Sequence, residues 1–123
     1  MTAYAIAHLR NHPGPHPDVI AYLERIQDTL EPFAGRFRVH GGPMEVREGE
    51  WPGNVVVIEF PSMERARAWY DSEAYQEILP LRTDHIDSTA FLVEGVGPGY
   101  HPRRKAEAMR RAADARPSAP AAS

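Results

Sequence analysis

The sequence contains no cysteine and a single lysine, and both scarcities exclude classes of chemistry. Without cysteine, the 123-residue chain has no disulfide, no thiolate nucleophile and no cysteine-bound zinc or iron–sulfur site. Because Lys105 is the only lysine, residues 1–100 offer no amine for a Schiff base with a substrate or with pyridoxal phosphate. No apolar run approaches the ~20 residues that a membrane-spanning helix needs. Histidines, carboxylates, hydroxyls and arginines remain to supply any chemistry.

Charge is unevenly distributed along the chain. Residues 1–100 hold 8 arginines and 15 acidic residues, a net charge of −7, whereas residues 101–123 hold 6 basic and 2 acidic residues, a net charge of +4. Phosphate binding needs clustered positive charge, so we expect no nucleic-acid partner. The basic tail has a poor apolar face, so we expect no membrane partner either. Residues 1–10 lack the pattern of a secretory signal, which predicts a cytoplasmic location.

Alternating apolar and polar side chains predict strands. We place them at residues 4–10, 36–40, 55–60 and 87–94, with Met44 and Val46 suggesting a short extension of the second. The third strand is apolar on both faces, which indicates that both faces are covered.

Three- and four-residue spacing of apolar side chains predicts a helix that begins at Pro17 and is closed by Pro32 and Gly35. Ser62 and Ser72 are predicted N-caps of two further helical segments, at residues 63–70 and 73–81. A last helix is possible at residues 103–115, before a Pro/Ala/Ser segment at residues 117–123 that is typical of disorder.

The resulting order, β-α-β-β-α-β, predicts an α+β ferredoxin-like fold, with a four-stranded antiparallel sheet and the helices on one face. We assign residues 1–96 to this domain and residues 97–123 to a basic C-terminal extension, partly helical or disordered. The fold leaves one sheet face open, although the strand at residues 55–60 is apolar on both sides. A homodimer in which two sheets pack face to face resolves this conflict.

Several segments, in order and in spacing, resemble the DUF1330 family. They are Arg36–Pro43 (RFRVHGGP), Glu48–Pro52 (EGEWP), Val57–Pro61 (VIEFP), Ala68–Tyr75 (AWYDSEAY) and Leu92–Gly95 (LVEG). The resemblance covers roughly residues 3–96 and implies a protomer of the dimeric α/β-barrel superfamily. Its wider relatives include lactone isomerases, polyketide cyclases, cofactor-independent monooxygenases and haem-degrading enzymes, so it implies no single activity.

Three residues are candidate catalytic groups. His40 ends a strand on the polar face that it shares with Arg36 and Arg38, and a neutral imidazole there could act as a general base; an edge histidine facing water is the alternative. His8 shares a strand face with Tyr4 and Ile6 and, if that face is inward, is either a base or a hydrogen-bonded core residue. The third candidate is Glu59.

Glu59 interrupts an apolar strand, so we expect it to be a buried carboxylate with a partner. Arg82 is the proposed partner, either as a structural ion pair or as a pocket pair that orients an anionic or carbonyl substrate. Trp69, Tyr75 and Tyr22 are candidate substrate-binding residues, because they offer aromatic walls and hydroxyl groups; core packing is the alternative.

His8, His12 and His16 recur every four residues, a spacing that would align metal ligands on a helix. Prolines between them exclude a helix, so only a loop could gather them, with Asp18 as a possible fourth ligand. Exposed loop histidines are the favoured interpretation, and we expect no metal.

These residues favour a small cofactor-independent enzyme that uses acid–base chemistry of the lyase, isomerase or cyclase type. Its pocket would lie between sheet and helices, with His40 or His8 moving a proton and Arg82 or Tyr75 stabilising an enolate-like oxygen. We expect a small-molecule ligand and no cofactor. The alternatives are a non-catalytic ligand-binding or accessory homodimer and a cofactor-free monooxygenase.

Overall fold

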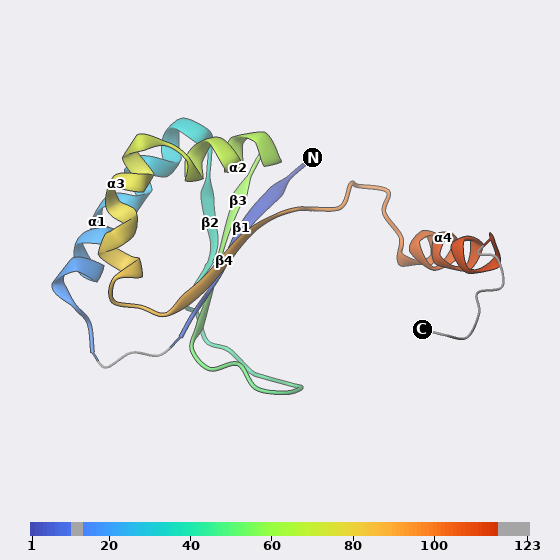
Figure 1. Ribbon diagram of the computed structural model, residues 1–123, viewed down its shortest axis with the longest axis horizontal. Helices are drawn as coiled ribbons and strands as arrows, with labels where there is room; N and C mark the ends of the chain where they lie inside the picture. The colour runs from blue at the N-terminus through green and yellow to red at the C-terminus, as the bar shows by residue number, and fades with distance from the viewer. Residues whose placement is uncertain (11–13, 116–123) are drawn as a thin grey trace, which may run out of the picture.

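The computed structural model of the chain describes residues 1–10 and 14–115. Its main body consists of one sheet with helices on one side (Figure 1). The elements are β1 (Ala3–Leu9), α1 (Pro17–Leu30), a short 3₁₀ helix η1 (Glu31–Phe33), β2 (Arg36–His40), β3 (Asn54–Phe60), α2 (Met63–Tyr70), α3 (Glu73–Thr83), β4 (Ser88–Glu94) and α4 (Pro102–Ala115).

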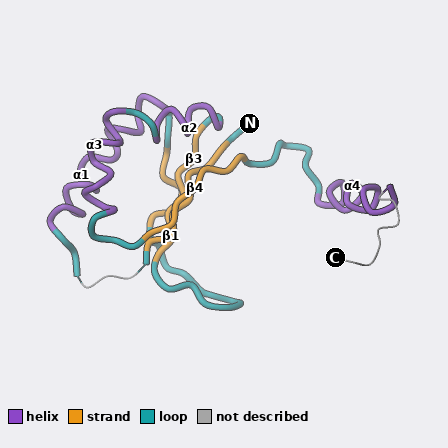
Figure 2. The backbone as a smooth tube through the Cα atoms, viewed as in Figure 1, coloured by secondary structure: helices purple, strands orange, loops and turns teal. Residues whose placement is uncertain are grey.

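The sheet has the strand order β2-β3-β1-β4, and each neighbouring pair is antiparallel. Helices α1, α2 and α3 all lie on one side of it, and the other side is open (Figure 2). This arrangement confirms the predicted α+β ferredoxin-like fold. The predicted strand extension at Met44 and Val46 is wrong, because these residues lie in the long loop between β2 and β3.

The helices begin where side chains can accept from free backbone N–H groups. Ser62 accepts from the N–H of Arg65 at 3.1 Å and Ser72 from the N–H of Tyr75 at 3.2 Å, which confirms both predicted N-caps. The cap of α1 is His16, whose Nδ1 accepts from the N–H of Asp18 at 3.0 Å.

Helix α1 ends where the sequence predicts, but a residue other than glycine turns the chain. The helix stops at Leu30, and the residue that turns the chain in the left-handed conformation is Ala34, with φ of 57°. Gly35 is required for space, since a Cβ there would lie 2.6 Å from Cε1 of Phe60. The glycine therefore lets the turn pack directly against β3.

Alternate residues of each strand face the helices or the open side. On β3, Val56, Ile58 and Phe60 are buried beneath the helices. On the open face, Ile6 pairs with Val57 on one side and with Phe91 on the other. Phe91 is 51% exposed, which is high for a phenylalanine in a sheet. The open face therefore carries an apolar stripe across β3, β1 and β4.

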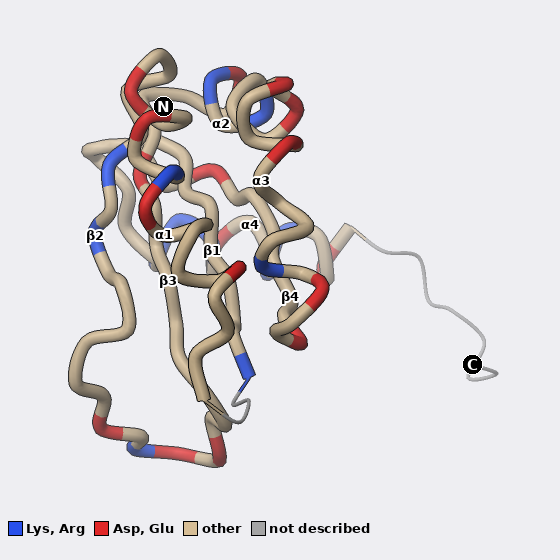
Figure 3. Tube along the Cα trace, turned by 90° about the vertical axis from the view of Figure 1, so that its left-hand side faces the viewer, with Lys and Arg blue, Asp and Glu red and all other residues tan. Residues whose placement is uncertain are grey.

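Strand β2 forms one edge of the sheet and carries arginines, seen as blue segments in Figure 3. Charged side chains on an edge strand oppose pairing with further strands. The open face therefore has two regions, a polar edge at β2 and an apolar stripe across β3, β1 and β4.

Helix α4 follows β4 after a linker and lies apart from the helices of the main body (Figure 1). It confirms the predicted helix in the extension, and all of its residues are exposed. The segment at residues 117–123, predicted to be disordered, lies outside the described residues, as does His12. No helix within residues 1–10 and 14–115 is long and apolar enough to cross a membrane.

Candidate functional site

Small side chains on the helix-facing side of the sheet leave space beneath the helices. Ala5 and Ala7 face this side from β1, and Ala7 pairs with Ala90 of β4. A cavity of about 520 Å³ lies between this alanine floor and the helices. Its apolar walls include Val19, Ile26, Val56, Ile58, Trp69 and Leu92.

A pair of tyrosines places two hydroxyl groups at the cavity. The hydroxyl oxygens of Tyr22 on α1 and Tyr75 on α3 lie 2.8 Å apart, and both side chains are buried. Trp69 packs against Tyr75 with a ring-centroid distance of 4.1 Å, and its Nε1–H donates to the hydroxyl of Thr29 at 3.0 Å. The hydroxyl pair is therefore held by a packed aromatic cluster.

The Tyr22 hydroxyl is kept protonated by its surroundings. Burial raises the pKa of Tyr22 far above its ordinary value, and the neighbouring Tyr75 raises it further. A tyrosine that holds its proton is a hydrogen-bond donor at every physiological pH. The pair can therefore donate one hydrogen bond to a ligand oxygen while its internal bond persists.

Arg82 brings a positive charge to the same cavity. It lies in the last turn of α3, is 6% exposed, and lines the cavity. Its Nη1 donates to the hydroxyl of Ser88, and its guanidinium lies 5.5 Å from the ring centroid of Tyr22. Burial lowers the pKa of Arg82, but the tyrosine oxygens outweigh this effect and the pKa stays raised. Arg82 therefore carries its charge in the folded protein.

His40 lies at one end of the cavity, but on a different strand face from the predicted one. A register irregularity in β2 between Phe37 and Val39 shifts the alternation, as a β-bulge does. Phe37 and His40 consequently stack, with ring centroids 4.5 Å apart, and both line the cavity. Asn54 and Arg10 line it too, and they join His40 at the end of the sheet where β1 and β2 finish.

His8 was expected in the pocket between sheet and helices, and the structure places it on the opposite, open face. There its Nε2–H donates to the carbonyl oxygen of Pro52 at 2.6 Å, and its ring stacks on Trp51 with centroids 4.2 Å apart. The inward face of β1 is the one that carries the alanines. His8 therefore ties the β2–β3 loop to the sheet.

Glu59 was expected to be buried and paired with Arg82, and this expectation is wrong. It lies on the open face, its side chain is 30% exposed, and its Oε1 accepts from Nε of Arg38 at 2.8 Å. The hydrogen bond from Arg38 lowers the pKa of Glu59. Arg82 and Glu59 thus lie on opposite sides of the sheet.

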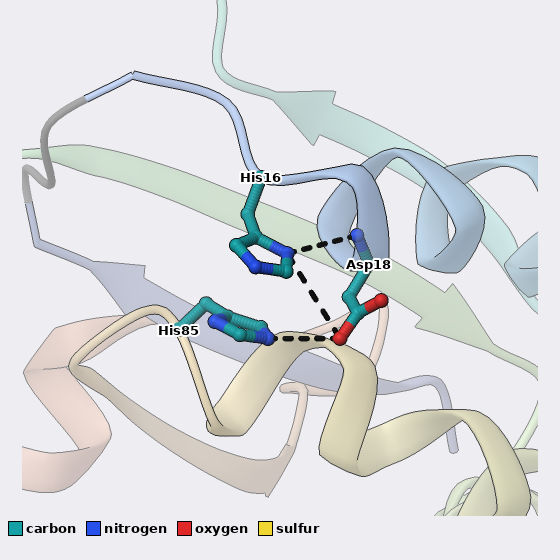
Figure 4. A group of neighbouring side chains, drawn as sticks. All are labelled: His16, Asp18 and His85. Atoms are coloured by element: carbon teal, nitrogen blue, oxygen red, sulfur yellow. Dashed lines mark hydrogen bonds and ion pairs between the residues drawn. The ribbon is translucent and has the colours of Figure 1, made fainter.

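A second polar cluster gathers His16, Asp18 and His85, from the start of α1 and the end of α3 (Figure 4). His85 Nε2 lies 3.0 Å from Oδ2 of Asp18, and the two imidazole rings stack with centroids 3.6 Å apart and planes 16° apart. A metal bound by a ring nitrogen lies in the plane of that ring, so one ion does not fit both stacked planes. The cluster is arranged as a helix cap with a histidine–carboxylate contact.

Of the candidates from the sequence, the structure brings together His40, Tyr22, Trp69, Tyr75 and Arg82 around one cavity, and it leaves His8 and Glu59 outside. The sequence reasoning missed the cavity floor. Its signal was available in the three alternating alanines Ala3, Ala5 and Ala7, which mark a strand face without bulk.

The fold resembles solved structures at low sequence identity. A protein of unknown function from Rhodopseudomonas palustris aligns with a TM-score of 0.61 and 19% identity, over 79% of this chain and 84% of that chain. A dimeric ferredoxin-like protein of unknown function from Jannaschia sp. aligns with a TM-score of 0.49 and 17% identity, over 74% and 98%. SnoaB, a cofactor-independent oxygenase from Streptomyces nogalater, aligns with a TM-score of 0.48 and 11% identity, over 81% and 96%.

At these identities the first likeness supports the shared fold and not an activity. No protein with a curated function matches the chain. Residues 2–96 match the family model described as "Domain of unknown function (DUF1330)". Because the match spans most of the sequence, the chain belongs to the DUF1330 family.

Proposed function

We propose that the protein is a small cofactor-independent enzyme that performs acid–base chemistry on a small molecule held in the cavity between sheet and helices. The reaction would be of the lyase, isomerase or cyclase type. The observation that carries this proposal is the buried hydroxyl pair of Tyr22 and Tyr75, 2.8 Å apart, beside the charged Arg82 in a mostly apolar cavity. Ligand sites are typically apolar cavities in which a small number of polar groups converge.

The size of the cavity supports a small-molecule ligand. Its volume of about 520 Å³ lies within the ~300–1,000 Å³ of usual ligand sites. An apolar lining excludes water, which strengthens the interaction between a developing negative charge and nearby donors.

The residues divide the proposed chemistry between two roles. His40, at the end of the cavity, would accept a proton from a carbon next to a carbonyl group. The enolate-like oxygen formed would accept hydrogen bonds from Tyr75 and Arg82, which are already fixed by the packing of α3. Tyr22 holds Tyr75 in place through the bond between their hydroxyl groups.

We also propose that the chain is a homodimer formed through the open face of the sheet. The stripe of Ile6, Val57 and Phe91 lies at the centre of this face, and the Arg38–Glu59 pair lies beside its edge. An apolar centre with a polar rim is typical of protein interfaces. A second copy supplies the same stripe, as a two-fold symmetric interface requires.

The test of the enzyme proposal is proton exchange at carbon. The protein is incubated in D₂O with a panel of small enolisable ketones and keto acids, and loss of the α-proton signal is followed by ¹H NMR. Wild-type protein should accelerate exchange for at least one compound, and Ala7→Leu, which fills the cavity floor, should abolish the acceleration. Binding of these compounds without any exchange would contradict the proposal and favour a non-catalytic ligand-binding dimer.

A further inference from the structure

Within the described residues, Arg82 is a buried cation without a counter-ion. At 6% exposure it is among the most buried polar residues of the chain, and a buried charge is costly unless it is paired. Among residues 1–10 and 14–115, no carboxylate lies within 4.0 Å of its guanidinium. Its neighbours are the hydroxyl of Ser88, the aromatic face of Tyr22 and the hydroxyl oxygens of Tyr22 and Tyr75. None of these groups is a carboxylate that could neutralise its charge.

Three other carboxylates have partners of their own. Asp87, one residue before Ser88, lies 3.5 Å from Arg10, and Asp18 lies 3.0 Å from His85. Glu59, on the opposite face, is bound by Arg38. The charge of Arg82 therefore has no neutralising group within the described part of the chain.

The guanidinium has unused donors that a ligand can reach. It carries five N–H groups, and the hydrogen bond to Ser88 uses one of them. In the described residues, no side-chain nitrogen or oxygen that is fully shielded from solvent lacks a hydrogen-bond partner. The Arg82 nitrogens without a partner are therefore not fully shielded from solvent, and Arg82 lines the cavity.

We propose that the natural ligand of this cavity carries a carboxylate group, and that Arg82 binds this carboxylate while the apolar walls hold the rest of the molecule. The proposal rests on the cavity being the functional site, as proposed above. The planar guanidinium fork matches a carboxylate in two parallel hydrogen bonds. Arg10 also lines the cavity but is paired with Asp87, so within the described residues Arg82 is the lining cation that has no carboxylate partner. One such cation neutralises a single negative charge, which favours a carboxylate over a phosphate dianion.

Trp69 provides a direct signal for occupancy. The chain has two tryptophans, and Trp69 lines the cavity whereas Trp51 lies in the β2–β3 loop. In a Trp51→Phe background, fluorescence therefore reports Trp69 alone. The probes are 3-phenylpropionate, its neutral amide 3-phenylpropionamide, and inorganic phosphate, each titrated into the full chain.

The acid should bind at least about tenfold more tightly than the amide, because a charge-assisted pair is far stronger than a neutral hydrogen bond. Arg82→Gln should remove this preference, and Arg38→Gln, on the other face, should retain it. Equal binding of acid and amide by the Trp51→Phe protein would overturn the proposal even if Arg82→Gln failed to fold. Phosphate binding more tightly than the acid would overturn it as well.

The binding measurement with the acid and the amide does not depend on whether the protein catalyses a reaction. If Arg82-dependent carboxylate binding is found and no α-proton exchange occurs, the ligand assignment stands and the enzymatic proposal fails. If exchange occurs for neutral ketones as readily as for keto acids, the enzymatic proposal stands and the ligand assignment fails.

Discussion

The hydroxyl groups of Tyr22 and Tyr75 meet 2.8 Å apart although the residues are 53 positions apart in the sequence. This contact joins α1 to α3 beside the cavity, and the same two helices are also linked by the exposed Arg25–Glu77 ion pair at 3.7 Å. The same bond therefore contributes to the fold and to the proposed site.

Removal of one hydroxyl should destabilise the protein. Tyr75→Phe leaves the Tyr22 hydroxyl without its partner, and we expect a loss of about 1–2 kcal/mol in the free energy of unfolding. The double variant Tyr22→Phe/Tyr75→Phe should lose less than the sum of the two single changes, because no unpaired hydroxyl remains. Urea unfolding of the four proteins measures this coupling, and strictly additive losses would show that the bond contributes nothing.

Glu59 should titrate below its ordinary pKa. The Arg38 hydrogen bond stabilises the carboxylate in the folded state, so the pKa of Glu59 lies below 4.5. A lowered folded-state pKa means that this contribution to stability is present above about pH 4.5 and is lost as the pH falls through the folded pKa. Carboxyl ¹³C NMR should show the pKa of Glu59 rising in Arg38→Gln. An unchanged titration curve would argue against the pairing.

Gly35 and Gly42 allow a matched test of packing. A Cβ at Gly35 would lie 2.6 Å from a ring carbon of Phe60, whereas a Cβ at Gly42 meets no atom within 4 Å. Gly35→Ala should cost about 1–3 kcal/mol, as over-packing of a core does. Gly42→Ala should leave the thermal midpoint nearly unchanged. Similar midpoints for both variants would mean that the turn after η1 is loosely packed.

The open face should be required for dimerisation. Phe91→Asp places a charge within the apolar stripe, at its β4 end, and size-exclusion chromatography with light scattering should then give the monomer mass. Ile20→Asp is the control, because Ile20 is similarly exposed but lies on α1, on the other side of the sheet. A wild-type protein that is already monomeric at micromolar concentration would refute the homodimer.

The element order could be predicted from the sequence because its signals are local. Ser62 and Ser72 cap their helices through residues three positions later, and such spacing is visible without a structure. The turn after α1 was only partly predictable, because Gly35 is required by its distance from Phe60, which no local pattern reveals.

The candidate site was harder to predict because both faces of the sheet carry apolar residues. A period of two shows that Ile6 and His8 share a face, but hydrophobicity alone does not identify that face as the open one. The alanine face of β1 turned inward, which moved His8 out of the cavity. The bulge in β2 had the opposite effect on His40, because it places this side chain on the face of the sheet that borders the cavity.

The most direct test of a reaction in the cavity beneath the helices compares two histidines on opposite faces of one sheet. The rate of α-proton exchange is measured by NMR for His40→Ala and His8→Ala, with the compound that wild-type protein turns over fastest. Loss of a general base typically costs 10²- to 10⁴-fold in rate, roughly the loss that we predict for His40→Ala, while His8→Ala should retain most of the wild-type rate. A wild-type rate in His40→Ala, or a collapse confined to His8→Ala, would contradict a reaction in the cavity beneath the helices.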